Sequence, residues 1–526
     1  MKKSLMMLAA IVCYVMTTAV FTACTKVDDP EPIPIHSEPE TLAEYTIMYY
    51  GFGGGNLDNI YVQKIGNFYK AAPEAFKKVN VVVQYKFSTA ANLEKQGLTE
   101  EACNYYGSKT FRLAVDPDDF ILDQMREEGF YGADNADVAC PDSLTHFINW
   151  AAEAYPAKKY MLIVNDHGGG YVPDDELPET ISATTRGILY DDGNFTPAQK
   201  KNHFTAKSLH RAVDAANVRI EIFYVEACLM NTLEYQFELQ DLCDYTIAST
   251  YSKPSIEGAY EALPNLLSQS SLDIEQALDK YCKASVESWD LGIGFDEAIP
   301  RYTDLTVTRT ANISHLGEVL REFIDRLCDT YANGTDAQRQ AINKCTAKAV
   351  KVDADRPSYD AVKYVKSIIN ALPEVYGEAF NNRMKEAFNN CILAQYYSKY
   401  LTNHEFMVDY SVLLGAKGAY AYTIWEIQEE TGLLTLTHER IHFYDGDYQY
   451  YSVSVSKDNP SIIRLEPTGK VLYWGSTMAD TYEQLAFDRA VGWSRWLKLN
   501  QQWPKLFSEA GFQAPLPMPE DDNGQN

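Results

Sequence analysis

Two short apolar runs in this chain each end in a residue that can take part in nucleophilic chemistry. Residues 160–164 (Tyr-Met-Leu-Ile-Val) lead through Asn-Asp to His167, which three glycines follow. Residues 220–225 (Ile-Glu-Ile-Phe-Tyr-Val) lead through Glu-Ala to Cys228. A strand buried on both faces reads as a short continuous apolar run, and in an open parallel sheet ligands bind at the carboxyl ends of the strands. The pattern therefore predicts that His167 and Cys228 lie side by side at one edge of such a sheet.

Strand-like and helix-like patterns alternate around these two runs. Strands are predicted at residues 45–50, 79–83, 160–164, 220–225 and 245–248, and helices at 60–76, 142–154 (with Asp142 as the N-cap), 206–216 and 231–239. Alternation at this spacing predicts an α/β fold, a mostly parallel sheet with helices on both faces. After residue 267 the patterns are longer and helical; strands are then predicted at 418–424, 433–437 and 462–474, and a helix at 482–499.

The first 24 residues have the composition of a targeting segment. A basic start, Met1 to Lys3, precedes an apolar stretch and the small-residue sequence Phe-Thr-Ala-Cys24. The last four residues resemble the lipobox of bacterial lipoproteins, in which the cysteine is acylated, so Cys24 is the expected anchor to a lipid bilayer. An ordinary secretory signal that ends near a cysteine is the alternative. The acidic, proline-rich stretch that follows is typical of an extended tether, and Lys26 to Asp29 resembles a signal for the outer membrane surface.

Composition excludes some partners and some kinds of site. The chain has 526 residues, 46% of them apolar, which is enough for a large core. Its net charge of -27 opposes binding to nucleic acid and attracts a cationic peptide. The ten cysteines lack the spacing of a zinc site or a disulfide scaffold. Beyond the signal, no run has the roughly 18 apolar residues that a membrane helix needs.

The residue types at the two strand ends fit a cysteine nucleophile with a histidine partner. A thiol attacks as the thiolate, so it needs a base nearby and donors for the oxyanion that forms. His167 would be the general acid/base, and the backbone N–H groups of Gly168 and Cys228 would bind the oxyanion. On spacing alone, a lone histidine after a strand is more often a turn residue, and a lone buried cysteine more often has a packing role. A G-x-S-x-G elbow, an H-E-x-x-H motif and a nucleotide-binding glycine pattern are all absent from the sequence.

The amino-acid sequences of these motifs closely resemble those of the clostripain family of cysteine peptidases, which are relatives of caspases and gingipains. The similar segments are Asp142 to Trp150, Tyr155 to Gly168, Glu226 to Glu234, Ile247 to Ser249 and shorter pieces from Gly55-Asn-Leu-Asp58 to Trp493, which together span roughly residues 41 to 505. The resemblance implies a caspase-like three-layer α/β/α sandwich, with a mixed helical and β C-terminal region. It also implies that Cys228 is the nucleophile and His167 the general acid/base of an endopeptidase.

Family members prefer Arg or Lys before the cleaved bond and read it with carboxylates. Glu226 stands where the family has aspartate, one methylene shorter, and a carboxylate there still pairs with a guanidinium. Glu257 lies where the family tends to build another wall of the pocket, although the surrounding segment departs from the family wording. A solvated loop carboxylate is the alternative for each of them. The expected partners are therefore proteins or peptides with basic residues.

Two further properties of the family bear on the connection between the motifs. Some members cleave themselves there, and Lys200 and Lys201 are the candidate self-cleavage positions in this chain. Some relatives depend on Ca²⁺, and the acidic groups 174–176 and 191–192 supply oxygen ligands, but their spacing matches no EF-hand loop. We therefore expect no required cofactor or metal, with calcium left open and solvated charge as the alternative.

The sequence thus predicts five segments. They are a signal peptide (1–23), an acidic tether (24–40), a caspase-like catalytic core (41–266), a helical and β region that completes the peptidase (267–510) and a polar tail (511–526). The expected protein is a cysteine endopeptidase of the cell envelope, anchored by lipid to the outer membrane and exposed at the surface. A catalytically silent surface lipoprotein of the same fold, which binds peptide or glycan, is the rival, because fold does not guarantee activity.

Overall fold

A computed structural model describes the greater part of the chain. The described residues are 42–122, 125, 138–168, 170, 204–251, 253–254, 258–291, 303–347, 351–353, 356–399, 401, 413–415, 425–427, 434–436, 440–444, 449–455, 463–471 and 483–500. The predicted signal peptide, tether and polar tail lie outside these residues, as does most of the connection between the two motifs.

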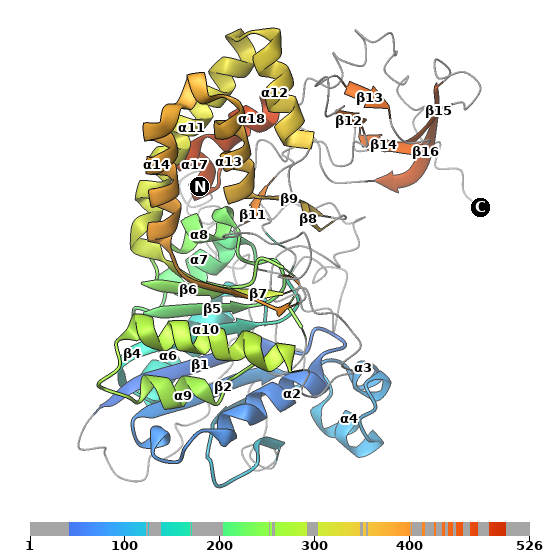
Figure 1. Ribbon diagram of the computed structural model, residues 1–526. Coiled ribbons are helices and arrows are strands. Elements are labelled where there is room, and N and C mark those ends of the chain that lie inside the picture. Colours follow the sequence, from blue (N-terminus) through green and yellow to red (C-terminus); the bar gives the residue numbers. More distant parts are fainter. Residues whose placement is uncertain are drawn as a thin grey trace, which may run out of the picture.

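An eight-stranded sheet forms the centre of the molecule, in the order β10-β7-β6-β5-β4-β1-β2-β3 (Figure 1). Its strands are β1 (Ala43–Phe52), β2 (Val79–Lys86), β3 (Thr110–Ala114), β4 (Ala157–Asn165), β5 (Ile222–Glu226), β6 (Tyr245–Ala248), β7 (Asp304–Arg309) and β10 (Ile392–Tyr397). Five neighbouring strands of the sheet, in the order β2-β1-β4-β5-β6, run parallel. The other three, β3, β7 and β10, pair antiparallel. The predicted mostly parallel sheet is confirmed, and β7 and β10 add strands from beyond residue 267.

Helices cover both faces of this sheet. Side chains of β1 alternate between the two faces: Met48 and Tyr50 pack into one apolar cluster, Ile47 and Tyr49 into the other. The first face carries α6 (Pro141–Ala154), α7 (Ala206–Asp214) and α8 (Leu233–Leu239), and the second carries α2 (Asp58–Gly66), α9 (Ala262–Leu267) and α10 (Ile274–Asp290). The protein is therefore a three-layer α/β/α sandwich, as predicted.

The remaining described elements extend the sandwich at its ends. Beside the start of α2 lie α3 (Ala90–Lys95) and α4 (Glu100–Tyr106), and next to α7 and α8 lies a group of helices from the C-terminal half of the chain (Figure 1). That group comprises α11 (Ile313–Asn333), α12 (Asp336–Ala347), α13 (Ala361–Ala371), α14 (Pro373–Cys391), α17 (Ala486–Val491) and α18 (Trp493–Asn500). Three small sheets are formed by β8 (Lys351–Asp353), β9 (Arg356–Asp360), β11 (Leu413–Gly415), β12 (Trp425–Ile427), β13 (Leu434–Leu436), β14 (Arg440–Tyr444), β15 (Gln449–Val455) and β16 (Ile463–Val471).

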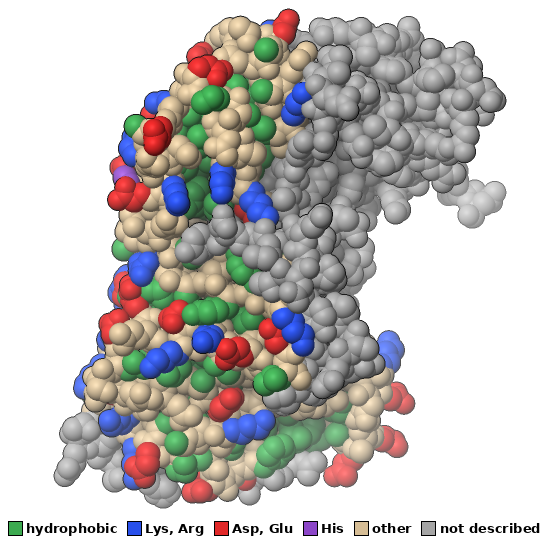
Figure 2. All heavy atoms as spheres, in the orientation of Figure 1, with side chains coloured by type: hydrophobic (Ala, Val, Ile, Leu, Met, Phe, Trp, Pro, Cys, Tyr) green, Lys and Arg blue, Asp and Glu red, His purple; other side chains and the backbone are tan. Residues whose placement is uncertain are grey.

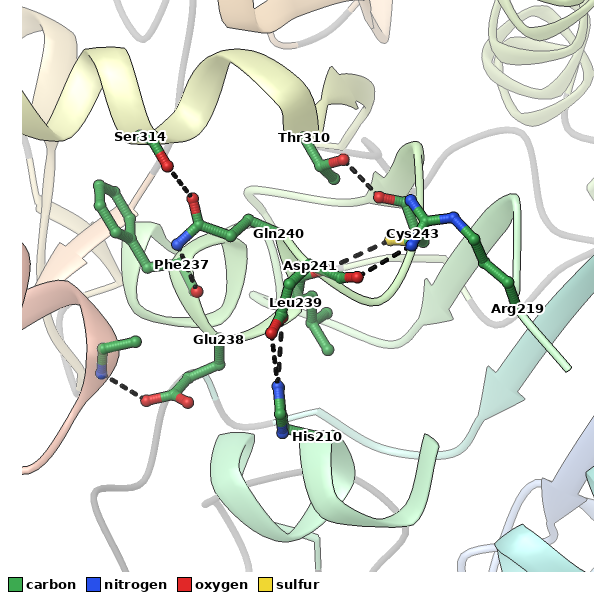
Figure 3. Close-up of polar contacts among 11 residues, drawn as sticks. His210, Arg219, Phe237, Glu238, Leu239, Gln240, Asp241, Cys243, Thr310 and Ser314 are labelled. Atoms are coloured by element: carbon green, nitrogen blue, oxygen red, sulfur yellow. Dashed lines mark hydrogen bonds and ion pairs between the residues drawn. The ribbon is translucent and has the colours of Figure 1, made fainter. Parts of the chain in front are cut away.

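Helix α8, the first helix after Cys228, ties the C-terminal helices to the sheet (Figure 3). Ser314 of α11 donates a hydrogen bond of 2.9 Å to Gln240 at its end. The backbone N–H of Ala486, the first residue of α17, donates one of 2.6 Å to Glu238. Through these bonds and the apolar cluster of this face, helices from the end of the chain pack on α8, the helix that follows Cys228.

Three predictions about helices are wrong in detail. The helix predicted at 60–76 begins at Asp58 and ends at Gly66, and short 3-10 turns follow it; Pro73, which the interior of an α-helix does not accommodate, lies inside the predicted range. Asp142 is not the N-cap of α6: Cys140 occupies that position, and Pro141, whose fixed φ suits the first helical residue, begins the helix. The helix predicted at 482–499 is two helices, separated by Gly492 at φ 75.

Candidate active site

The register of two neighbouring strands sets the positions of His167 and Cys228. Asn165, the last residue of β4, pairs with Glu226, the last residue of β5, in a parallel arrangement. His167 and Cys228 each follow two residues later, and adjacent strands are about 4.8 Å apart. The two residues therefore leave the sheet side by side, at its carboxyl edge.

Gly168 packs directly against the backbone of Cys228. A Cβ atom on Gly168 would lie 2.2 Å from the carbonyl oxygen of Cys228 and 2.9 Å from its nitrogen, so no larger residue fits without moving the backbone. Within the described part of the chain, the N–H group of Cys228 donates no hydrogen bond. Its role as an oxyanion donor, expected together with the N–H of Gly168, stays a prediction.

A strained turn holds Cys228 at the end of β5. Leu229 has φ 62, an unusual value for a residue other than glycine, and its side chain is buried. Its N–H donates to the carbonyl of Tyr251 at 3.1 Å, and the N–H of Asn231 donates to Ser249 at 2.9 Å. Strain of this kind persists only where surrounding bonds fix it, and it gathers at functional sites.

A buried carboxylate in turn fixes the segment that receives these bonds. Asp304, the first residue of β7, accepts hydrogen bonds from the N–H groups of Thr250 (2.7 Å) and Tyr251 (3.0 Å) and from the hydroxyl of Ser249 (3.0 Å). Gln395 of β10 donates to its other oxygen at 2.9 Å. The C-terminal strands thereby position the chain around Cys228. The sequence carried no recognisable signal for this role.

His167 is exposed, and its ring is oriented from the loop after β1. Its Nε2 atom lies 2.8 Å from Oδ1 of Asn56. Because an amide oxygen only accepts, a ring protonated on Nε2 donates to Asn56 in this geometry. Gly54, at φ 57, packs beneath the ring: its Cβ would lie 2.8 Å from Cδ2 of His167. Sequence reasoning missed Asn56, although it belongs to the Gly55-Asn-Leu-Asp58 segment of the resemblance.

The thiol of Cys228 contacts Lys253, which follows β6. The N–H of Lys253 lies 3.2 Å from Sγ as a donor, and its carbonyl oxygen lies 3.7 Å from Sγ as an acceptor. Six other described cysteines are free: Cys103, Cys243, Cys282, Cys328, Cys345 and Cys391. Burial raises the thiol pKa of five of them, Cys103, Cys243, Cys282, Cys328 and Cys391, which makes these weaker nucleophiles.

Glu226 lies under this site, at the centre of a buried group that we call the Glu226 cluster: Lys64, Tyr224, Glu226, Lys253 and Trp289. Both lysine ammonium groups bind the same carboxylate oxygen, Oε1, that of Lys64 at 3.0 Å. The Lys253 ammonium also lies over the rings of Tyr224 (5.0 Å) and Trp289 (5.4 Å). With its side chain wholly buried, Glu226 is no solvated loop carboxylate, and that alternative is wrong.

The charges of the cluster shift each other's protonation. Burial alone would raise the pKa of Glu226, but Lys253 and Lys64 more than offset it, so the pKa lies below the usual value. Burial, together with repulsion from Lys64, lowers the pKa of Lys253 to about 7 despite the nearby carboxylate. Glu226 is therefore ionised at neutral pH, and Lys253 is the group closest to losing its charge.

Four predicted residues lie outside the described residues: Cys24, Lys200, Lys201 and Glu257. The acidic groups 174–176 and 191–192 lie outside them as well. Within the part of the chain that is described, no group of three or more His, Cys, Asp or Glu side chains is arranged to hold a metal ion.

Comparisons with known proteins agree with this fold. Residues 77–464 match the model of the Clostripain family. A solved structure of a secreted C11 cysteine protease from Bacteroides thetaiotaomicron, in complex with an irreversible peptide inhibitor, is 16% identical and covers 86% of this chain and 99% of its own, with a TM-score of 0.51. An inactive zymogen C11 protease from Parabacteroides distasonis is 12% identical over 86% of this chain and 99% of its own, with a TM-score of 0.47. No curated protein matches the chain. The first structure shows a shared fold.

Proposed function

The chain belongs to the clostripain family of cysteine peptidases, and from this premise we propose that it is an endopeptidase with Cys228 as nucleophile and His167 as general acid/base. The observation that carries the proposal is the pairing of Asn165 with Glu226, which brings the two residues to one sheet edge. The close packing of Gly168 on Cys228, which joins the turns after β4 and β5, supports the same proposal.

The proposed mechanism uses groups already in place. His167 accepts the proton of the Cys228 thiol; the resulting thiolate attacks the peptide carbonyl, and the N–H groups of Cys228 and Gly168 stabilise the oxyanion. His167 protonates the leaving amine, and a thioester to Cys228 remains. His167 then takes a proton from water, which attacks the thioester and frees the acid product. Asn56 orients the His167 ring for this exchange through its contact with Nε2.

We propose that the bond cleaved follows Arg or Lys and that Glu226 reads the basic side chain. Glu226 ends the strand that carries the nucleophile, two residues before it, and is ionised by its surroundings. The net charge of -27 favours a cationic peptide at longer range. Figure 2 shows acidic and basic side chains interspersed over the described part of one face, so on that face the attraction is spread rather than gathered in one patch.

Arg- and Lys-amide reporters test this function. Wild type should cleave them in a reaction that iodoacetamide blocks and Cys228→Ala abolishes, with no loss in EDTA. An activity that EDTA removes and Ca²⁺ restores would reveal a calcium requirement. A folded protein that cleaves no peptide from a broad library, yet binds peptide or glycan, would instead support the catalytically silent rival.

Processing and location follow as separate proposals. We propose self-cleavage at Lys200 or Lys201, which would appear on SDS gels as two fragments in wild type and one band in Cys228→Ala. We also propose a lipid anchor on Cys24 at the outer membrane, which labelling with a fatty acid should reveal in wild type and not in Cys24→Ser. None of the described helices is long and apolar enough to cross a bilayer.

A further inference from the structure

The Glu226 cluster contains one cation more than its carboxylate requires. Lys64 and Lys253 both bind Oε1 of Glu226, so two buried positive charges face one negative charge. A buried charge is stable only when it is paired, and a second like charge beside the pair adds repulsion and desolvation cost. If Lys253 left, Lys64 would still neutralise Glu226.

The two lysines are held very differently. Lys64 lies in the last turn of α2, packed over Tyr61 at 4.8 Å. Lys253 lies between β6 and α9, and its described contacts are confined to Cys228 and the Glu226 cluster. Of the two cations, Lys253 is therefore the one that can leave without disturbing a helix.

Lys253 also lies on the site as a substrate residue would. Its backbone N–H and carbonyl oxygen lie 3.2 and 3.7 Å from Sγ of Cys228, while its ammonium reaches the buried carboxylate. One residue thus contacts both the nucleophile and the group proposed to read the substrate's basic side chain.

The position that the Lys253 ammonium fills is suited to a basic side chain from outside. The faces of Tyr224 and Trp289 attract a cation. The second oxygen of Glu226, Oε2, is buried without a hydrogen-bond partner in the described structure. A planar guanidinium with two parallel N–H donors could bind both carboxylate oxygens, which a single ammonium does not.

We propose that Lys253 is an internal pseudosubstrate: its ammonium occupies the place of the substrate's Arg or Lys side chain, which binds Glu226 only after Lys253 has left. The proposal rests on the proposed function. It makes Lys253 the group that a basic substrate must displace before it can bind Glu226. A guanidinium competes best, because it alone gains the bond to Oε2.

The test compares Lys253→Met, which keeps the apolar stem, with Lys253→Arg, which keeps the charge. The kcat/KM of an Arg-amide reporter relative to that of a Leu-amide reporter should rise at least about tenfold in Lys253→Met, mainly through KM, since losing a competing ion pair is worth about one factor of ten. Lys253→Arg, whose guanidinium can bind both oxygens of Glu226, should lower the ratio below the wild-type value. Lys253→Gln repeats the measurement should the methionine variant fold poorly in a thermal melt.

A second readout is independent of turnover. Benzamidine, a planar cation, is titrated by calorimetry into Cys228→Ala and into the same protein with Lys253→Met added, which should bind it about tenfold more tightly. Equal affinities, together with an unchanged Arg/Leu ratio in an active enzyme, would overturn the pseudosubstrate and leave the peptidase proposal intact. Tighter benzamidine binding with no cleavage of any peptide would support the inference while refuting the proposed function.

Discussion

Gly168 and Cys228 touch through their backbones, closer than a methyl group between them would permit. This contact joins the turns after β4 and β5, which carry the two residues of the proposed dyad. Since the Cβ of any other residue at position 168 would lie within 3 Å of Cys228 backbone atoms, the side chain of residue 168 decides how near the two turns can come.

Gly168→Ala should therefore disable the enzyme with its sheet intact. The added methyl must push the Cys228 turn away from His167, and a misplacement of about 1 Å can cost about a hundredfold in rate. We expect kcat/KM for an Arg reporter to fall by about that factor. Gly66→Ala, where a Cβ would meet nothing within 4 Å, is the matched control. Equal activities of the two variants would contradict this account of the site.

Asn56→Ala should lower kcat about tenfold and leave KM nearly unchanged, because it removes the acceptor that orients the His167 ring without touching the carboxylate of Glu226. Asn56→Asp, which keeps an oxygen acceptor, should recover part of the loss and shift the pH profile of kcat upward, since a carboxylate stabilises the imidazolium. A change confined to KM in Asn56→Ala would show that the residue does not position the histidine.

Asp304→Ala should be among the more damaging core substitutions. It leaves the backbone N–H groups of Thr250 and Tyr251 buried without their acceptor, at a cost of about 3 kcal/mol in the free energy of unfolding. The same loss should loosen the turn that carries Cys228 and lower activity in the fraction that remains folded. Denaturation of Asp304→Ala alongside Asp214→Ala, an exposed position on α7, measures the difference. Equal midpoints would show that the buried carboxylate is dispensable.

The lowered pKa of Lys253 predicts a particular dependence of stability on pH. Burial lowers this pKa from 10.5 to about 7, so between these values the unfolded chain binds more protons than the folded one. Stability then rises with pH across that window, and the full penalty of the charged lysine is present below pH 7.

Lys253→Met lacks this penalty, whereas Glu226, Lys64 and Cys228, the charged and titratable groups that influence Lys253, are the same in both proteins. The variant should therefore exceed wild type in unfolding free energy most at pH 6, and the excess should shrink toward pH 9. Urea denaturation at several pH values measures it. Two parallel stability curves would mean that Lys253 titrates normally.

The local patterns predicted the sheet well because its strands are buried on both faces. The run 160–164 has no charged interruption and the run 220–225 has a single one, Glu221, and β4 and β5 contain most of each run. The helix boundaries were less predictable, because Pro141 and Gly492 each impose a backbone geometry that the apolar periodicity does not reveal.

The identity of the candidate site could be predicted from the sequence, but its surroundings could not. His167 and Cys228 follow strands whose pairing is implied by the α/β alternation. The partners of Glu226 come from α2 and from beyond β6, and Asp304 reaches the site from β7, more than 70 residues after the nucleophile. Such contacts depend on three-dimensional packing, and no spacing in the sequence marks them.

The most direct test of the central claim is to identify the residue that a substrate-like alkylating agent modifies. A lysyl chloromethyl ketone, followed by digestion and mass spectrometry, should label Cys228 alone among the cysteines, and the label should disappear in His167→Ala. The buried thiols of Cys243, Cys282 and Cys391, whose pKa values are raised, should stay unmodified. Labelling of another cysteine, or undiminished labelling of Cys228 without His167, would contradict the proposed dyad.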